Sequence, residues 1–139
     1  SMYGMTEKAV RFVEGILADE GIKVNIHKVP EESWGPILAS VLSSKGVILA
    51  MPTYEFKMYP PVAAVLEELG KKKFINRKAF RFGSYAWSGG AEKELHEIVT
   101  KHRMNWDMLE SVEFMGAPTN EDFQLIEERV RQLVANVRA

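Results

Sequence analysis

The stretch Gly46-Val47-Ile48-Leu49-Ala50-Met51 carries no polar side chain and is followed by Pro52. An uninterrupted apolar run of this length is typical of a central strand in a parallel sheet, because helices cover both faces of such a strand. The neighbouring segments agree, since apolar residues recur at helical spacing in residues 31–44 and again in residues 60–70. The stretch therefore predicts one buried strand of an α/β sheet.

The same alternation of helix and strand extends along the whole chain. Amphipathic or apolar patterns predict further helices at residues 6–20, 91–102 and 121–137, and strands at residues 22–29, 79–84 and 111–115. This order predicts a doubly wound α/β fold with a parallel sheet and right-handed crossovers. With 139 residues and no flexible linker, the chain is expected to form a single domain spanning residues 1–139.

The composition excludes several classes of protein. The hydrophobic share is 46% and the charged share 27%, which is too apolar for intrinsic disorder. A net charge of -1 predicts no general affinity for nucleic acid or an anionic membrane, and the absence of cysteine excludes disulfides and thiolate metal sites. The longest apolar run, residues 46–52, is far shorter than the ~20 residues that cross a membrane. We expect a soluble, cytoplasmic domain.

Three loops are candidates for a ligand site, because ligands of open α/β sheets bind beyond the carboxyl ends of the strands. Residues 1–6 place hydroxyls and a glycine before a helix, where backbone N–H groups favour a phosphate. Residues 52–59 and 84–90 supply the aromatic side chains Tyr54, Phe56, Tyr59, Tyr85 and Trp87. Each signal alone is more often a helix cap or a lid on the core. Together they predict a slot for a planar ligand with a phosphate tail.

Three segments of the sequence carry a resemblance to a known family. They are Ser1-Met2-Tyr3-Gly4-Met5-Thr6-Glu7, Ala50-Met51-Pro52-Thr53-Tyr54 and Phe82-Gly83-Ser84-Tyr85-Ala86-Trp87-Ser88-Gly89-Gly90-Ala91. They resemble the three FMN-binding loops of the flavodoxin-like domain of flavodiiron proteins, also called A-type flavoproteins. The third segment is the most specific, and the similarity extends across essentially the whole chain. The resemblance implies a flavodoxin-like sheet of order 2-1-3-4-5, whose first strand is missing from this chain.

The resemblance also implies which residues bind FMN. The phosphate would be held by the first segment, through Ser1, Met2, Tyr3, Gly4, Met5 and Thr6. One side of the flavin ring would be lined by the second, through Pro52, Thr53, Tyr54, Glu55 and Phe56. The other side would be lined by the third, through Ser84, Tyr85, Ala86, Trp87, Ser88 and Gly89. The sequence departs from the family pattern at Met5, Met51, Glu55, Phe56 and Ala86, and a carboxylate at Glu55 would disfavour an anionic reduced flavin.

The function implied by the resemblance is electron transfer. The chain would be the C-terminal FMN domain of a longer flavodiiron protein, relaying electrons to a di-iron site in a separate metallo-β-lactamase-like domain that reduces oxygen or nitric oxide, often within a homodimer. The isolated domain would then be an electron carrier without catalytic or metal-binding residues of its own. The alternatives are a free-standing flavodoxin-like carrier and a structural or interaction domain that has lost FMN.

A basic run allows two interpretations. It comprises Lys71, Lys72, Lys73, Arg77, Lys78 and Arg81, with no acidic residue between them. Such a run is more often a solvated turn at the beginning of a strand. The alternative is a docking patch for an acidic redox donor such as rubredoxin, a partner that the family resemblance suggests.

Overall fold

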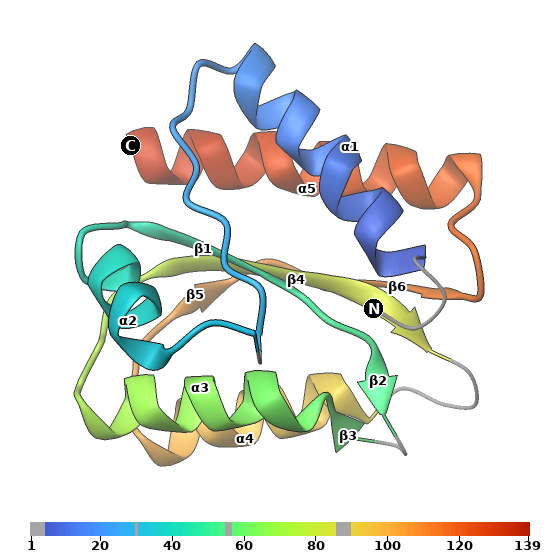
Figure 1. Ribbon diagram of the computed structural model, residues 1–139. Coiled ribbons are helices and arrows are strands. Elements are labelled where there is room, and N and C mark those ends of the chain that lie inside the picture. The colour runs from blue at the N-terminus through green and yellow to red at the C-terminus, as the bar shows by residue number, and fades with distance from the viewer. Residues whose placement is uncertain (1–4, 30, 55–56, 86–89) are drawn as a thin grey trace.

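The computed structural model describes residues 5–29, 31–54, 57–85 and 90–139. A parallel sheet lies between two layers of helices (Figure 1). The helices α1 (Met5–Asp19) and α5 (Asn120–Arg138) cover one face, and α3 (Pro60–Lys71) and α4 (Ala91–Lys101) cover the other. The short helix α2 (Trp34–Leu42) packs on the side of α3 and α4 through Ile37. All five helices agree with the sequence-based expectation, with ends that differ by one to a few residues.

The sheet is centred on the longest strand, β4 (Lys78–Tyr85). On one side β4 pairs in parallel with β1 (Gly46–Ala50), in a register that aligns Val47 with Ala79. On the other side β5 (Asp107–Met108) pairs with the beginning of β4, and β6 (Val112–Met115) pairs with its end. The strands expected at residues 46–51, 79–84 and 111–115 are therefore present. The strand β5 was not expected, because two residues are too few to show an alternating pattern in the sequence.

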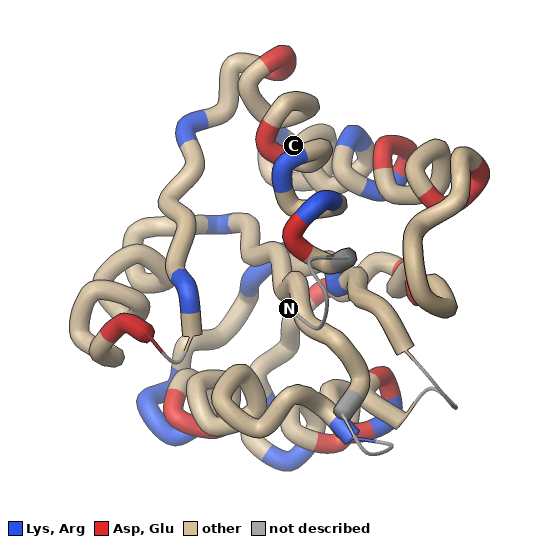
Figure 2. The backbone as a smooth tube through the Cα atoms, turned by 45° about the vertical axis from the view of Figure 1, so that its right-hand side comes forward, with Lys and Arg blue, Asp and Glu red and all other residues tan. Residues whose placement is uncertain are grey.

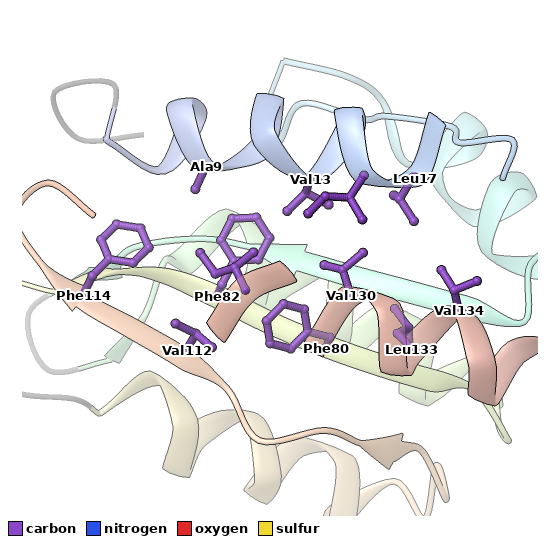
Figure 3. Packing of buried hydrophobic residues seen from close by; sticks show 12 residues of the cluster. Ala9, Val13, Leu17, Phe80, Phe82, Val112, Phe114, Val130, Leu133 and Val134 are labelled. Atoms are coloured by element: carbon purple, nitrogen blue, oxygen red, sulfur yellow. The ribbon is translucent and has the colours of Figure 1, made fainter. Parts of the chain in front are cut away.

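Two apolar clusters hold the layers together. Successive side chains of a strand point to opposite faces, so Phe80 and Phe82 of β4 reach the cluster beneath α1 and α5 (Figure 3). There they contact Val13 of α1 and Val130 of α5. Ala79, on the other face of β4, belongs to the second cluster, between the sheet and α3 and α4. Burial of both faces is what the apolar run predicted for this sheet.

The strand expected at residues 22–29 is not formed. This segment has no regular structure, and it passes from the end of α1 across the sheet toward α2 without pairing to β1 (Figure 1). A groove of about 670 Å³ separates the two, lined on one wall by Ile22, Val24 and Ile26 and on the other by Val47 to Ala50. A strand exists only through hydrogen bonds to a neighbour, so alternating side chains alone could not make one here.

The same groove changes the place of β1 in the sheet. The sequence predicts a central strand, but among the described residues β1 pairs only with β4, and all five of its residues are half-buried. One edge of β1 therefore faces the groove. The prediction of a central position was wrong for the described residues. An apolar pattern indicates that both faces of a strand are covered, but it does not indicate whether a neighbouring strand pairs with each of its two edges.

Candidate functional site

The first and third predicted loops meet at the carboxyl end of the sheet. Thr6, in the first turn of α1, and Ser84, near the end of β4, are both buried, and their hydroxyl oxygens lie 3.4 Å apart. This contact brings the positive end of the α1 dipole to the edge where β1 and β4 terminate. Buried hydroxyls beside a helix N-terminus suit the phosphate that the sequence predicts at this edge.

The second predicted loop is fixed against the same end of β4 by a close approach of two backbones. The backbone N–H of Met51 donates to the carbonyl of Phe82 at 3.0 Å. A Cβ atom placed on Gly83 would lie 1.6 Å from the carbonyl oxygen of Met51, which no side chain allows. Glycine is therefore required at position 83 for the chain to turn over β4 at Pro52.

The second loop continues as a short hairpin rather than as irregular chain. The strands β2 (Thr53–Tyr54) and β3 (Lys57–Met58) pair antiparallel, aligning Thr53 with Met58. Met58 is buried, and its backbone N–H donates to the Glu94 carboxylate of α4 at 3.2 Å. The hairpin is thus held by the sheet at one end and by α4 at the other.

A buried arginine lies beneath this hairpin. Arg81 of β4 has no exposed side-chain surface, and its Nη2 donates to the hydroxyl of Thr53 at 3.3 Å. The Thr53 hydroxyl in turn donates to Glu113 of β6, also at 3.3 Å, and Glu113 lies 3.4 Å from Nη1 of Arg81. Glu92 of α4 is a more distant second carboxylate, at 3.8 Å. Burial lowers the pKa of Arg81, and the charges of Glu113 and Glu92 oppose that effect.

This arrangement corrects the interpretation of Arg81 as part of a basic surface run. Its aliphatic stem and guanidinium are enclosed, because the hairpin and α4 cover that face of β4 and the Glu113 side chain of the neighbouring strand β6 lies beside it. The sequence did carry a signal for this burial, because an arginine inside an apolar strand is enclosed with it and then needs charged or hydrogen-bonding partners. The two glutamates lie on separate elements far along the chain, so the pattern could not name them.

The predicted site residues are brought together where the structure describes them. Thr6, Pro52, Thr53 and Ser84 are buried, and Tyr85 is half-buried at the end of β4. Met5 begins α1 and Tyr54 ends β2. The remaining predicted residues lie outside the described part of the chain: Ser1, Met2, Tyr3, Gly4, Glu55, Phe56, Ala86, Trp87, Ser88 and Gly89.

The three histidines have partners in the protein. His27 contacts Glu32 and Ser40, His96 contacts Glu92 at 2.8 Å, and His102 contacts Glu67 at 2.7 Å. Within the described ranges, no group of three or more histidine or acidic side chains is placed to hold a metal ion. In the same ranges, no helix is both long and apolar enough to cross a membrane.

The rest of the basic run lies near the opposite end of the sheet, where β4 begins. Lys71 ends α3, and Lys78 begins β4 and pairs with Asp107 at 3.1 Å. Figure 2 shows that basic positions are interspersed with acidic ones along the helices. Lys72 pairs with Glu68 at 3.4 Å. The eight residues of β4 separate this end from Tyr85 by roughly 25 Å, at about 3.3 Å per residue.

Comparison with curated proteins finds relatives of much greater length. An anaerobic nitric oxide reductase flavorubredoxin of Pectobacterium carotovorum is 45% identical over 73 residues, and that of Aeromonas salmonicida is 34% identical over 115 residues. A coenzyme F420H(2) oxidase of Methanothermobacter marburgensis is 28% identical over 141 residues. These matches cover 52%, 83% and 99% of this chain but only 14%, 22% and 34% of the relatives. No protein-family model matches the chain.

Solved structures match the fold along nearly the whole chain. Rubredoxin oxygen:oxidoreductase of Desulfovibrio gigas superposes with a TM-score of 0.85 at 26% identity, covering 100% of this chain and 35% of that protein. A flavodoxin from the domain Archaea superposes with a TM-score of 0.82 at 19% identity, covering 100% of this chain and 94% of that one.

Fold and site together define a flavodoxin-like domain, with its ligand edge at the carboxyl ends of β1 and β4. The relatives identify the family within this fold: the chain belongs to the flavodoxin-like domains of the flavodiiron protein family. FMN is the cofactor of this domain in flavodoxin-like and flavodiiron homologues.

Proposed function

We propose that the chain binds FMN at the sheet edge formed by Thr6, Thr53 and Ser84 and serves as the electron-transfer domain of a flavodiiron-type oxidoreductase. The observation that carries this proposal is the contact between Thr6 and Ser84, which joins two of the three segments that resemble FMN-binding loops. Bound FMN supplies the redox chemistry, since it accepts and releases electrons. The residues of the chain bind, orient and shield it.

Each described residue of the edge has a role in this proposal. The N-terminus of α1, the positive end of the helix dipole, favours the phosphate, and the hydroxyls of Thr6 and Ser84 add polar partners beside it. Pro52 and Met51 are buried and exclude water from the floor of the second loop. Tyr85 offers a half-buried ring at the end of β4.

We place the chain within a longer protein. Residues 1–139 form the C-terminal flavin domain, and a di-iron centre in a metallo-β-lactamase-like domain takes up its electrons, within one chain or across a homodimer in the cytoplasm. Support comes from the names of the relatives, a nitric oxide reductase and a coenzyme F420H(2) oxidase, of which the chain spans 14% to 34%. The final acceptor is then oxygen or nitric oxide.

We also propose that the groove between residues 22–29 and β1 holds the first strand of the flavodoxin-like sheet. Support comes from the free edge of β1, from the unpaired segment opposite, and from the apolar walls between them. The start of α1 lies at the carboxyl edge of the sheet, so a parallel strand in the groove would end beside the beginning of this chain.

The electron donor that we propose is a small acidic redox protein such as rubredoxin. Its docking surface would have to lie near Thr6, Ser84 and Tyr85, because electron transfer requires proximity to the flavin. The basic run near Lys72 and Lys78 is at the opposite end of β4, and these two lysines pair with Glu68 and Asp107, so the run is a poor candidate for that surface.

A second candidate function is a free-standing flavodoxin-like carrier. One observation favours it: the chain covers 94% of an archaeal flavodoxin, so little beyond the first strand is needed to complete such a protein. A flavin domain separated from its di-iron partner would carry electrons between proteins by diffusion. Both functions require FMN.

Titration of the purified protein with FMN, followed by flavin fluorescence and visible absorbance, tests the proposal. We expect saturable one-to-one binding and a perturbed flavin spectrum. Thr6→Val and Ser84→Ala should each weaken binding, whereas Thr100→Val, on an exposed position of α4, should not. A folded protein that binds no FMN would leave only a structural or interaction role for the domain.

A further inference from the structure

Arg81 is the one charged residue that is buried in the described part of the molecule. Its guanidinium is fully buried, and its Nε and Nη1 have no hydrogen-bond partner among the described residues. A buried charge costs free energy unless it is paired and hydrogen-bonded, and apolar residues of similar size often replace such groups without loss of stability. Arg81 therefore calls for an explanation other than packing.

The contacts of Arg81 converge on one hydroxyl. Nη2 donates to Oγ1 of Thr53, and the same Oγ1 donates to Oε2 of Glu113. The other carboxylate oxygen of Glu113, Oε1, lies 3.4 Å from Nη1. We call Arg81, Thr53 and Glu113 the hairpin anchor, since the three side chains come from β4, β2 and β6. The single proton of the Thr53 hydroxyl is used by Glu113, so this hydroxyl points into the protein and is not a donor to a ligand.

The hairpin around Thr53 depends on a few attachments to the body of the protein. It is only two residues long on each side, and such a hairpin is not stable by itself. Before Thr53 the chain is held by the approach of Met51 to Gly83, and after it by the buried side chain of Met58 and the bond from the Met58 N–H to Glu94. The hairpin anchor is the attachment at Thr53 itself, in the middle of the segment that faces the proposed flavin.

We propose that Arg81 is a positioning residue, which holds Thr53 through the hairpin anchor so that the backbone of the second loop is presented to the flavin. The inference rests on the proposed FMN site. Glu113 and Glu92 are partly exposed, at 21% and 33% of their side chains, so water can hydrate both carboxylates if Arg81 is removed. Loss of Arg81 should then loosen the hairpin more than it destabilises the whole domain.

The first test needs no flavin. Amide hydrogen exchange, read by mass spectrometry on the flavin-free protein, is compared for wild type, Arg81→Met, Thr53→Val and the double variant, with global stability measured separately by urea unfolding. We expect at least tenfold faster exchange in residues 51–58 in each single variant. The matched control is Arg77→Met, because Arg77 contacts the carbonyls of Val41 and Ile75 at the other end of the strand.

The second test is FMN affinity in the same variants. Removal of a hydrogen bond to a charged group should weaken binding by roughly tenfold to a hundredfold. The double variant should bind no more weakly than Arg81→Met alone, because both changes break the same contact. Thr53→Ser, which keeps the hydroxyl, should recover most of the affinity that Thr53→Val loses. Arg77→Met should bind as wild type does.

The outcomes separate the possible explanations. Unchanged exchange at residues 51–58 in Arg81→Met, or a loss spread evenly over the domain, overturns the inference whatever the flavin does. Additive losses of affinity in the double variant also overturn it. A wild-type protein that binds no FMN refutes the proposed function, while the exchange experiment still decides the inference. If Arg81→Met does not fold, Glu113→Gln with Thr53→Val tests the same anchor with Arg81 in place.

Discussion

Gly83 shows how one residue sets the position of a loop. Its backbone is packed so closely against the carbonyl of Met51 that a methyl group cannot be added without moving one of two main chains. Gly15, on the exposed face of α1, has no atom within 4 Å of the same hypothetical methyl group. The two glycines look alike in the sequence, and only their surroundings distinguish them.

Gly83→Ala should therefore lower the free energy of unfolding by about 1–3 kcal/mol, as overpacking does, and should weaken FMN binding because the second loop shifts. Urea unfolding and flavin titration measure the two effects. Gly15→Ala should instead raise stability by roughly 0.5–1 kcal/mol, because alanine favours a helix interior. Equal behaviour of the two variants would contradict the close approach.

At the scale of elements, a charged contact joins α3 to α4. The His102 ring, which follows α4, lies against Gly70 of α3, where a Cβ would come within 2.4 Å of it, and contacts Glu67 at 2.7 Å. Lys101 adds a second contact to Glu67 at 3.2 Å. The hydrogen bond with His102, opposed by burial and aided by Lys101, holds the pKa of Glu67 below its ordinary value of 4.5.

The sign of the pH dependence follows from this lowered pKa. The Glu67 carboxylate stabilises the folded state fully above its unfolded pKa, and that contribution is lost as pH falls through its folded pKa. Glu67→Gln should flatten the decline of stability between about pH 5 and pH 3, measured by urea unfolding at each pH. His102→Phe, which keeps a ring against Gly70, should flatten the same interval. An unchanged slope in both variants would contradict the assignment.

The elements also show which patterns suffice for prediction. Helices α1, α3, α4 and α5 follow from apolar spacing, since a helix makes its own backbone hydrogen bonds. The strand at residues 22–29 had an equally regular alternation and is not formed, because its hydrogen bonds must come from a neighbour. A helix can therefore be predicted from its own residues, whereas a strand also depends on a neighbouring strand that the local sequence does not specify.

At the scale of the whole molecule, the groove beside β1 is the largest departure from a closed α/β sheet. It lies between the two helix layers, with Val134 and Val137 of α5 on one side and Val65 and Leu66 of α3 on the other. A strand in this position would be buried on both faces, and would pair with β1 on one edge and residues 22–29 on the other. Among the described residues, neither β1 nor residues 22–29 has a strand partner on the side that faces the groove.

A fusion tests whether the groove accepts such a strand. Eight apolar residues of valine and isoleucine placed directly before Ser1 should raise the unfolding temperature and protect the amides of β1 and residues 22–29 from hydrogen exchange. The matched control carries proline at two positions of the same segment, because proline cannot donate to a ladder. Equal protection by both fusions would refute the strand, and protection in the first alone would support it.

The candidate site could be predicted in part. The three loops follow from their position at one end of the sheet, and Thr6, Thr53 and Ser84 within them follow from the family resemblance; the structure brings Thr6 and Ser84 into contact. The role of the Thr53 hydroxyl could not be predicted, because its partners Arg81 and Glu113 come from two other strands. Arg81 was conspicuous inside an apolar strand and was still assigned to the surface, since no acidic residue separates it from the basic residues at positions 71–78.

The sequence by itself determined the helices, the strands β1, β4 and β6 and the family resemblance, and it predicted the end of the sheet at which the ligand site is proposed, because each depends on local spacing or on a motif. Only the tertiary structure decided that residues 22–29 are unpaired, that β1 has a free edge, that Gly83 touches Met51, and that Arg81 is enclosed beneath Thr53. Hydrogen-bond partners across a sheet and burial of a charge are set by segments distant in the chain, and periodicity carries no information about them.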